Sequence, residues 1–183
     1  MVPAVFLDKD GTLIPDIPYN VEPSKITLAD FAQEALGKFS DRGFKLIVIS
    51  NQSGVARGYF PESALIGVEQ RLQELLNPIR LDGFYYCPHH PQGKISDYGI
   101  ECDCRKPKAG MLLRAAKEHE IDLAKSWMIG DILNDVEAGR TAGCRSILIE
   151  NGNETEWILN AAREPHFRVK NLAEAAEIIL NHW

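Results

Sequence analysis

Long apolar runs are missing from this chain of 183 residues. A membrane-spanning helix needs roughly 20 consecutive apolar residues, and no stretch approaches that length. The first residues enter a short apolar run without the basic segment that opens a signal peptide. We therefore expect a cytoplasmic protein with no membrane partner.

Positive charge is in deficit. The chain has 20 Lys and Arg against 26 Asp and Glu, and its formal net charge is -6. Proteins that bind nucleic acids usually carry a basic face, so we expect no nucleic-acid partner. An anionic small molecule would have to be bound through local cations and backbone N–H groups.

Cysteine is scarce, and its placement is uneven. Cys87 is followed by His89, and Cys102 by Cys104, whereas Cys144 stands apart. Disulfides are rare in cytoplasmic proteins, while three thiolates and one imidazole complete a closed tetrahedral Zn²⁺ site. We predict a structural zinc ion that pins the loop 87–104, and an inert buried thiol at Cys144.

Repeats, low-complexity tracts and linkers rich in Gly or Ser are also absent, which predicts a single domain over residues 1–183. Short apolar runs alternate with segments of helical period, the pattern of an α/β fold with a Rossmann-like, doubly wound parallel sheet. The expected strands are 2–7, 44–49, 84–86, 126–129 and 146–149, and the expected helices are 30–41, 62–76, 108–119, 134–142, 154–162 and 171–181.

Two carboxylates follow the first expected strand. Ligands of such folds bind beyond the carboxyl ends of the strands, where the chain carries Asp8, Asp10, Gly11 and Thr12. The first acid can attack phosphorus, and the second can serve as general acid and base. Two acids this close favour a cation between them, which predicts Mg²⁺. An ordinary Asx turn is the alternative.

Further polar groups follow other strands. Ser50 offers a hydroxyl to a phosphoryl group, or forms a turn. Lys106 can neutralise the transition state and Arg105 can bind a second anionic group, unless both are surface cations. Asp131 suits a third carboxylate on Mg²⁺, and Asp135 can orient Lys106, hold a coordinating water or favour a helix N-terminus.

Together these segments resemble the four ordered motifs of the haloacid dehalogenase-like phosphatases over residues 5–135. The resemblance implies a Rossmann-like fold without a large cap domain, with Asp8 as nucleophile and Asp10 as general acid and base. It also implies Mg²⁺ held by Asp8, the backbone carbonyl of Asp10 and Asp131, with Ser50 and Lys106 stabilising the transferring phosphoryl group.

Within that superfamily, the segments 51–58 and 87–93 resemble the heptose-bisphosphate phosphatase branch, which carries a zinc loop. This resemblance implies removal of the 7-phosphate from D-glycero-D-manno-heptose 1,7-bisphosphate, a step toward the heptose of lipopolysaccharide or surface glycans. Ile132 departs from the Lys of that branch, which bears on the exact sugar. The implied substrate contacts are Asp16, Ile17, Pro18, Tyr19, Asn51, Gln52, Ser53 and Arg105.

Three other functions stay open at the level of sequence. They are a histidinol-phosphate phosphatase, a phosphatase of nucleic-acid ends, and an inactive module that binds phosphorylated ligands. The acidic net charge disfavours nucleic-acid ends, and the presence of every proposed catalytic residue disfavours the inactive module. We expect a monomer acting on a small sugar bisphosphate.

Overall fold

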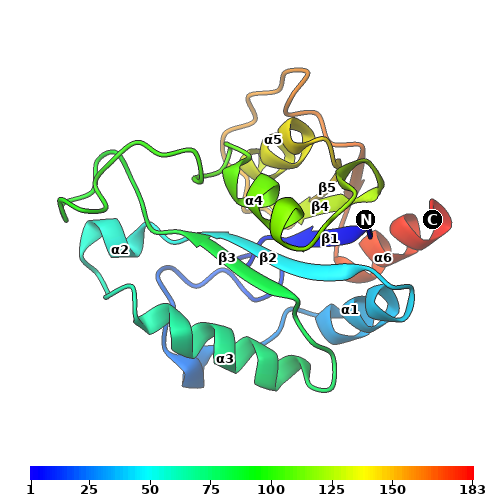
Figure 1. The fold of residues 1–183 in the computed structure, drawn as a ribbon, viewed down its shortest axis with the longest axis horizontal. Helices are drawn as coiled ribbons and strands as arrows, with labels where there is room; N and C mark the ends of the chain where they lie inside the picture. Colours follow the sequence, from blue (N-terminus) through cyan, green and yellow to red (C-terminus); the bar gives the residue numbers. More distant parts are fainter.

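The computed structural model describes residues 1–183 and is built on one six-stranded sheet with helices on both faces (Figure 1). Every neighbouring pair of strands is parallel, and the order β3-β2-β1-β4-β5-β6 is that of a doubly wound sheet. The predicted fold class is confirmed. The strands are β1 (Ala4–Leu7), β2 (Lys45–Asn51), β3 (Gly83–Cys87), β4 (Trp127–Gly130), β5 (Arg145–Ile149) and β6 (Phe167–Val169).

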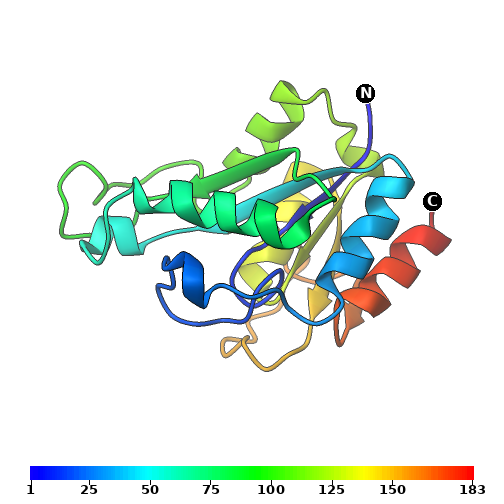
Figure 2. The same cartoon turned by 90° about the horizontal axis from the view of Figure 1, so that it is seen from below.

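The two faces of the sheet bury alternate residues of each strand. In β1, Val5 and Leu7 join the larger apolar cluster, while Ala4 and Phe6 join the smaller one. The larger cluster includes residues of α1 (Ala32–Asp41), α3 (Ala64–Leu76) and α6 (Leu172–Asn181). The smaller includes residues of α4 (Gly110–Glu118) and α5 (Leu133–Ala142), which lie on the opposite side of the sheet (Figures 1 and 2). Burial on both faces explains the nearly unbroken apolar runs.

The strand order reverses between β1 and β4, and this places the site. Ligands of doubly wound sheets bind beyond the carboxyl ends of the strands, where the connections from two neighbouring strands lead in opposite directions. Asp8 follows β1 and Asp131 follows β4, and the N–H of Asp8 donates to the carbonyl of Ile129 at 2.9 Å. At the same end of the sheet lie the short helix α2 (Gly54–Arg57) and the loop 87–104 (Figure 1).

The helix predicted over 154–162 is wrong, because residues 153–160 have no regular structure. The Glu154 carboxylate accepts from the N–H groups of Leu133 at 2.6 Å and Glu156 at 2.7 Å. Side-chain hydrogen bonds of this kind compete with a helix for the backbone. The apolar residues Trp157, Ile158 and Leu159 are consecutive rather than helically spaced, and all three are exposed.

The remaining differences are at element ends and in short elements. Asp30 does not cap α1; the N-cap is Phe31, at a φ of 64°, and its side chain makes no capping hydrogen bond. The strand β6 and the helix α2 were not predicted, since each is too short to show a period. Two short 3₁₀ helices, Pro23–Lys25 and Leu123–Lys125, complete the chain.

The longest connections on the substrate side are residues 8–31 and 88–109, and neither forms a separate cap. None of the helices combines the length and apolar character that crossing a membrane requires.

Candidate active site

Asp10 is held on both of its carboxylate oxygens. The Lys9 ammonium lies 3.1 Å from Oδ1, and the Gln52 amide donates to Oδ2 at 3.2 Å. The chain then turns at Gly11, whose φ of +87° is a conformation that residues with a side chain rarely adopt. This turn leaves Asp8 nearly buried at the strand end and Asp10 at the site's open side, with 29% of its side chain exposed.

A buried ammonium joins two of the acids. Lys106 Nζ donates to Asp8 Oδ1 at 2.6 Å, to Asp135 Oδ1 at 2.7 Å and to the carbonyl of Ile49 at 2.9 Å. All three N–H bonds are therefore used. Burial alone lowers the pKa of Lys106, but the carboxylates of Asp135 and Asp8 outweigh it and raise the pKa above its ordinary value. The side chain is a permanent positive charge beside Asp8.

The segment after β2 supports this lysine. The Asn51 side chain donates to the carbonyl of Lys106 at 3.1 Å and accepts from its N–H at 3.0 Å. Buried Ser50 Oγ accepts from the Gln52 amide at 2.7 Å. The structure thus brings Ser50 and Gln52 to Asp10, places Asn51 against the Lys106 backbone, and puts Ser53 at the N-cap of α2.

Asp131 lies just before Ile132, the N-cap of α5, and Asp135 lies in the first turn of that helix. Asp131 Oδ2 accepts from Asn153 Nδ2 at 2.8 Å, and its Oδ1 lies 3.4 Å from the Thr12 hydroxyl. Asp135 Oδ2 accepts from the N–H groups of Asp131 and Ile132, both at 3.2 Å. Asp135 therefore makes two of the three contacts weighed for it, the helix N-terminal contact and the contact with Lys106, while the coordinating water stays a prediction.

Three buried carboxylates converge here. Asp8, Asp131 and Asp135 each offer one oxygen, and these atoms lie within 4.8 Å of one another. Burial raises the pKa of Asp131 to about 8, with repulsion from Asp8 and Asp135 adding to it. Burial and then Asp8 raise the pKa of Asp135 to about 6, although Lys106 opposes this. Burial also raises the pKa of Asp8 against the same lysine. The three carboxyl groups outnumber the one ammonium group that contacts them, that of Lys106.

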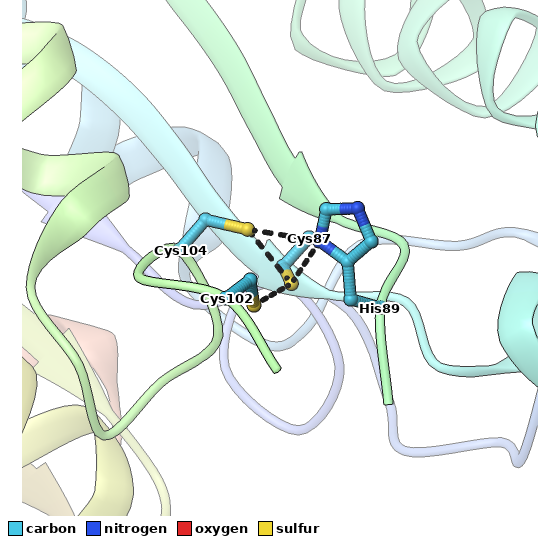
Figure 3. Close-up of side chains that lie close together, drawn as sticks. All are labelled: Cys87, His89, Cys102 and Cys104. Atoms are coloured by element: carbon cyan, nitrogen blue, oxygen red, sulfur yellow. Dashed lines mark hydrogen bonds between the residues drawn. The ribbon is translucent and has the colours of Figure 1, made fainter. Parts of the chain in front are cut away.

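A second cluster lies at the end of β3 and in the loop after it (Figure 3). Cys104 Sγ is 3.0 Å from Cys87 Sγ and 3.3 Å from His89 Nδ1, and Cys102 Sγ is 3.5 Å from Cys87 Sγ. Hydrogen bonding from Cys87 lowers the pKa of Cys104 to about 5, while the same contact and burial raise the pKa of Cys87. The four side chains predicted from sequence do converge. Cys144 lies apart from them, buried in the smaller apolar cluster.

Two surfaces flank the carboxylates. The predicted substrate loop Asp16–Tyr19 is exposed, and Tyr19 packs edge-on against Tyr59 with ring centroids 4.6 Å apart. A cavity of about 420 Å³ is lined by Arg105, Lys106, Lys108 and His90 among others. Nη1 of Arg105 is buried and has no hydrogen-bond partner.

The chain is similar to known proteins in sequence and in fold. A family model described as HAD-hydrolase-like matches residues 103–175. The D-glycero-beta-D-manno-heptose-1,7-bisphosphate 7-phosphatase of Escherichia coli (strain K12) is 37% identical over 187 residues, covering 96% of this chain and 98% of that protein. Its counterpart in Pasteurella multocida (strain Pm70) is 39% identical over 183 residues, covering 98% and 97%.

The chain belongs to the haloacid dehalogenase-like phosphatases.

A solved relative carries the same fold over its whole length. The D,D-heptose 1,7-bisphosphate phosphatase from B. bronchiseptica, complexed with magnesium and phosphate, has a TM-score of 0.85 and 27% identity, with 100% of both chains covered. Haloacid dehalogenase-like phosphatases are phosphoric monoester hydrolases that use Mg²⁺, so this chain is an enzyme rather than a binding module.

The residues of this haloacid dehalogenase-like phosphatase fit a divalent cation. Mg²⁺ takes carboxylate oxygens and retains waters, and the cluster supplies three buried carboxylates. Burial, and then repulsion between the carboxylates, raises the pKa values of Asp131 and Asp135. The Cys/His cluster fits Zn²⁺ in the same way, since three thiolates and an imidazole make a full tetrahedral set.

Four polar residues of the site were missed from sequence. Lys9 sits between the two motif acids, and a buried lysine there has no signal beyond its position. Asn151, Asn153 and Glu154 were assigned no role, because a helix was expected to begin at Glu154. The Asn-Gly-Asn sequence signalled a turn, but not that it folds back onto the first motif.

Proposed function

We propose that this enzyme hydrolyses the 7-phosphate of D-glycero-β-D-manno-heptose 1,7-bisphosphate through an aspartyl-phosphate intermediate on Asp8. The observation that carries the mechanism is the buried Lys106, 2.6 Å from Asp8 at the switch point of the sheet. The substrate rests on the relatives named above, which match nearly the whole chain.

In the first step, an Asp8 carboxylate oxygen bonds to phosphorus while the bond from phosphorus to the sugar oxygen breaks. Asp10 gives its proton to the leaving oxygen, and Lys106 and Ser50 stabilise the charge on the remaining phosphoryl oxygens. In the second step, Asp10 takes a proton from water, which attacks phosphorus and releases phosphate and free Asp8. Asp10 is partly exposed at the open side of the site and is held in place by Lys9 and Gln52. This position suits both proton transfers, because the sugar oxygen and water can both reach it.

The two metal ions would bind at separate sites. Mg²⁺ would be held by Asp8, Asp131 and the backbone carbonyl of Asp10, and when bound it neutralises charge on the phosphoryl group. Zn²⁺ would be held by Cys87, His89, Cys102 and Cys104 in a purely structural role, fixing the loop that leads into Arg105 and Lys106. The N–H of Arg105 already donates to Cys102 Sγ at 3.4 Å.

Arg105 would bind the second phosphate of the substrate. Arg105 lines a cavity together with Lys108 and His90, and its buried Nη1 has no hydrogen-bond partner. Arg57 Nη2 lies 3.3 Å from His90 Nε2. The exposed loop Asp16–Tyr19 and the segment Asn51–Ser53 would form the remaining walls of the pocket. Ile132, at the N-cap of α5, supplies no cation where the branch carries Lys, so the anionic contacts fall on Arg105.

The fold assembles every proposed catalytic residue from one chain, which supports action as a monomer. Four free cysteines support a cytoplasmic location, where thiols stay reduced.

The test is Mg²⁺-dependent phosphate release from the heptose 1,7-bisphosphate, run beside histidinol phosphate at matched concentrations. We expect kcat/KM to favour the bisphosphate by about 100-fold or more, a preference that recognition of a second phosphate can supply. Comparable rates would leave the phosphatase mechanism standing and overturn the substrate.

Arg105→Ala sharpens the same assay. It should lower kcat/KM for the bisphosphate by about 100-fold, as expected for a lost charge-assisted contact, and leave a heptose 7-monophosphate nearly unaffected. Arg114→Ala is the matched control, because Arg114 lies in α4, is exposed and pairs with Glu118. Equal losses on both substrates would assign Arg105 a role in folding instead.

A further inference from the structure

The segment that follows β5 folds back onto the first motif. Asn153 Nδ2 donates to Asp131 Oδ2 at 2.8 Å, and Asn151 Nδ2 donates to the carbonyl of Gly11 at 2.7 Å. Asn153 N–H donates to the Asn151 side chain at 3.3 Å, and the Glu154 carboxylate accepts from Leu133 N–H. This segment therefore ties the turn after the nucleophile to both Asp131 and the start of α5.

The contact between Asn153 and Asp131 is closely packed. A Cβ atom added at Gly11 would lie 2.6 Å from Asn153 Nδ2 and would clash with Asp131 Oδ2. Position 11 therefore accepts only glycine while this contact is in place. Asn153 bonds one oxygen of Asp131, and the Thr12 hydroxyl lies 3.4 Å from the other. The Asp8 carboxylate is also in hydrogen-bonding contact with Asp131. One oxygen of this buried carboxylate is fixed, and the other is available to a cation.

We propose that Asn153 is a positioning residue for the divalent cation. It holds Asp131 in the orientation needed for metal binding, and Asn151 anchors the segment that carries it. The proposal rests on the proposed function, because it takes Asp131 as a metal ligand. A carboxylate already held in place loses little freedom when the cation binds, and removing such outer partners typically costs about 10- to 100-fold in metal affinity.

The experiment is calorimetric titration of zinc-loaded, magnesium-free protein with MgCl₂, alongside thermal unfolding of the same samples without Mg²⁺. The variants are Asn153→Ala, Asp131→Ala and the control Asn160→Ala. Asn160 lies in the same segment and is exposed, and its side chain accepts only from the nearby N–H of Ala162.

We expect Asn153→Ala to weaken Mg²⁺ binding by about tenfold or more, with the unfolding temperature of the magnesium-free protein close to wild type. Asn160→Ala should bind as wild type. Affinity within twofold of wild type for Asn153→Ala, or tighter binding, overturns the proposal. A fall in magnesium-free stability as large as the loss of binding energy would also overturn it, because the residue would then act only structurally.

Asp131→Ala separates the two levels of the account. If it abolishes Mg²⁺ binding while Asn153→Ala binds normally, the positioning role fails and the metal site stands. If Asp131→Ala binds like wild type, or if wild type does not bind, the metal site of the proposed function is wrong and the role of Asn153 with it.

Discussion

The two clusters of ligand side chains, at the same end of the sheet, are built in opposite ways. The Cys/His cluster comes from the end of β3 and the loop that follows it. Its four side chains lie between positions 87 and 104, and three thiols and one imidazole make a full tetrahedral set. The carboxylate cluster comes from the ends of β1 and β4 and the start of α5, and it surrounds a buried lysine. Asp8 lies more than 120 positions before the other two acids. The first organises a local segment, whereas the second exists only once the whole sheet has formed.

The comparison also shows how the clusters depend on each other. Cys104 lies two positions before Lys106, whose backbone is held by Asn51 on the neighbouring strand end. A disordered loop would release that lysine from the carboxylates, but disruption of the carboxylates leaves every ligand of the loop in place. We therefore expect damage to spread from the Cys/His cluster to activity and not in the reverse direction.

The largest expected effect follows from Cys102→Ser with Cys104→Ser. Because structural zinc contributes on the order of 10 kcal/mol in small sites, the double variant should lose zinc, unfold at a much lower urea concentration and lose activity as a consequence. Metal analysis and urea unfolding measure this. Cys144→Ala is the control, since that thiol lies in the apolar cluster, and it should retain about one zinc per chain. Undiminished stability in the double variant would contradict a structural zinc.

Asp8→Asn should impair the carboxylate cluster and leave the Cys/His cluster intact. Loss of the nucleophile should lower kcat by about 10⁴-fold or more, while zinc content and unfolding by urea stay near wild type. Asp30→Asn, an exposed acid that makes no cap, is the control. Wild-type turnover by a folded Asp8→Asn protein would remove the aspartyl-phosphate mechanism.

Lys106→Met tests the charge balance of the carboxylate cluster. The variant leaves Asp8 and Asp135 buried without their cation, which should destabilise the magnesium-free protein by about 3–5 kcal/mol. Added Mg²⁺ should restore part of that loss, although activity should not return. Lys108→Met, at a half-exposed cation, should change stability by less than about 0.5 kcal/mol. Equal stability of the two variants would show that the buried pair is unimportant.

The pH dependence should be the smallest effect. The raised pKa values of Asp131 (about 8) and Asp135 (about 6) mean that the folded, magnesium-free protein retains protons that the unfolded chain releases near pH 4. Their contribution to stability is complete below about pH 4 and is lost as the pH rises through about 8, by at most about 1.4 kcal/mol per pH unit for one proton. Urea unfolding at pH 6 and 8 measures the slope.

Mg²⁺ should flatten that slope, because the cation replaces the protons on these acids. Asp131→Asn should remove most of the slope without metal. A stability that rises from pH 6 to 8 in the magnesium-free wild type, and not in Asp131→Asn, would contradict the charge deficit of the cluster.

Much of this molecule could be predicted from sequence, because the signals lie within short segments of the chain. Strands buried on both faces leave continuous apolar runs, and the polar residue after each run marks the edge of the sheet where Asp8, Ser50 and Asp131 lie. The Cys/His cluster was predictable because its ligands occur as two close pairs.

What sequence did not reveal depends on contacts between distant segments. The contact of Asn153 with Asp131 requires β4 and β5 to be neighbours and the chain to leave β5 without forming a helix. Competition between the Glu154 side chain and a helix is decided by the partner it finds at Leu133, which is remote in sequence. Three-residue β6 carries too few positions for a period to appear.

The most direct test of the account is chemical trapping of the intermediate. Enzyme mixed with Mg²⁺ and the heptose bisphosphate, quenched during turnover and reduced with borohydride, should carry homoserine in place of Asp8 in its peptide map. Homoserine at position 8 in samples with substrate, and its absence from samples without substrate, is the predicted result. Reduction at another residue, or none in a sample with rapid turnover, would contradict it.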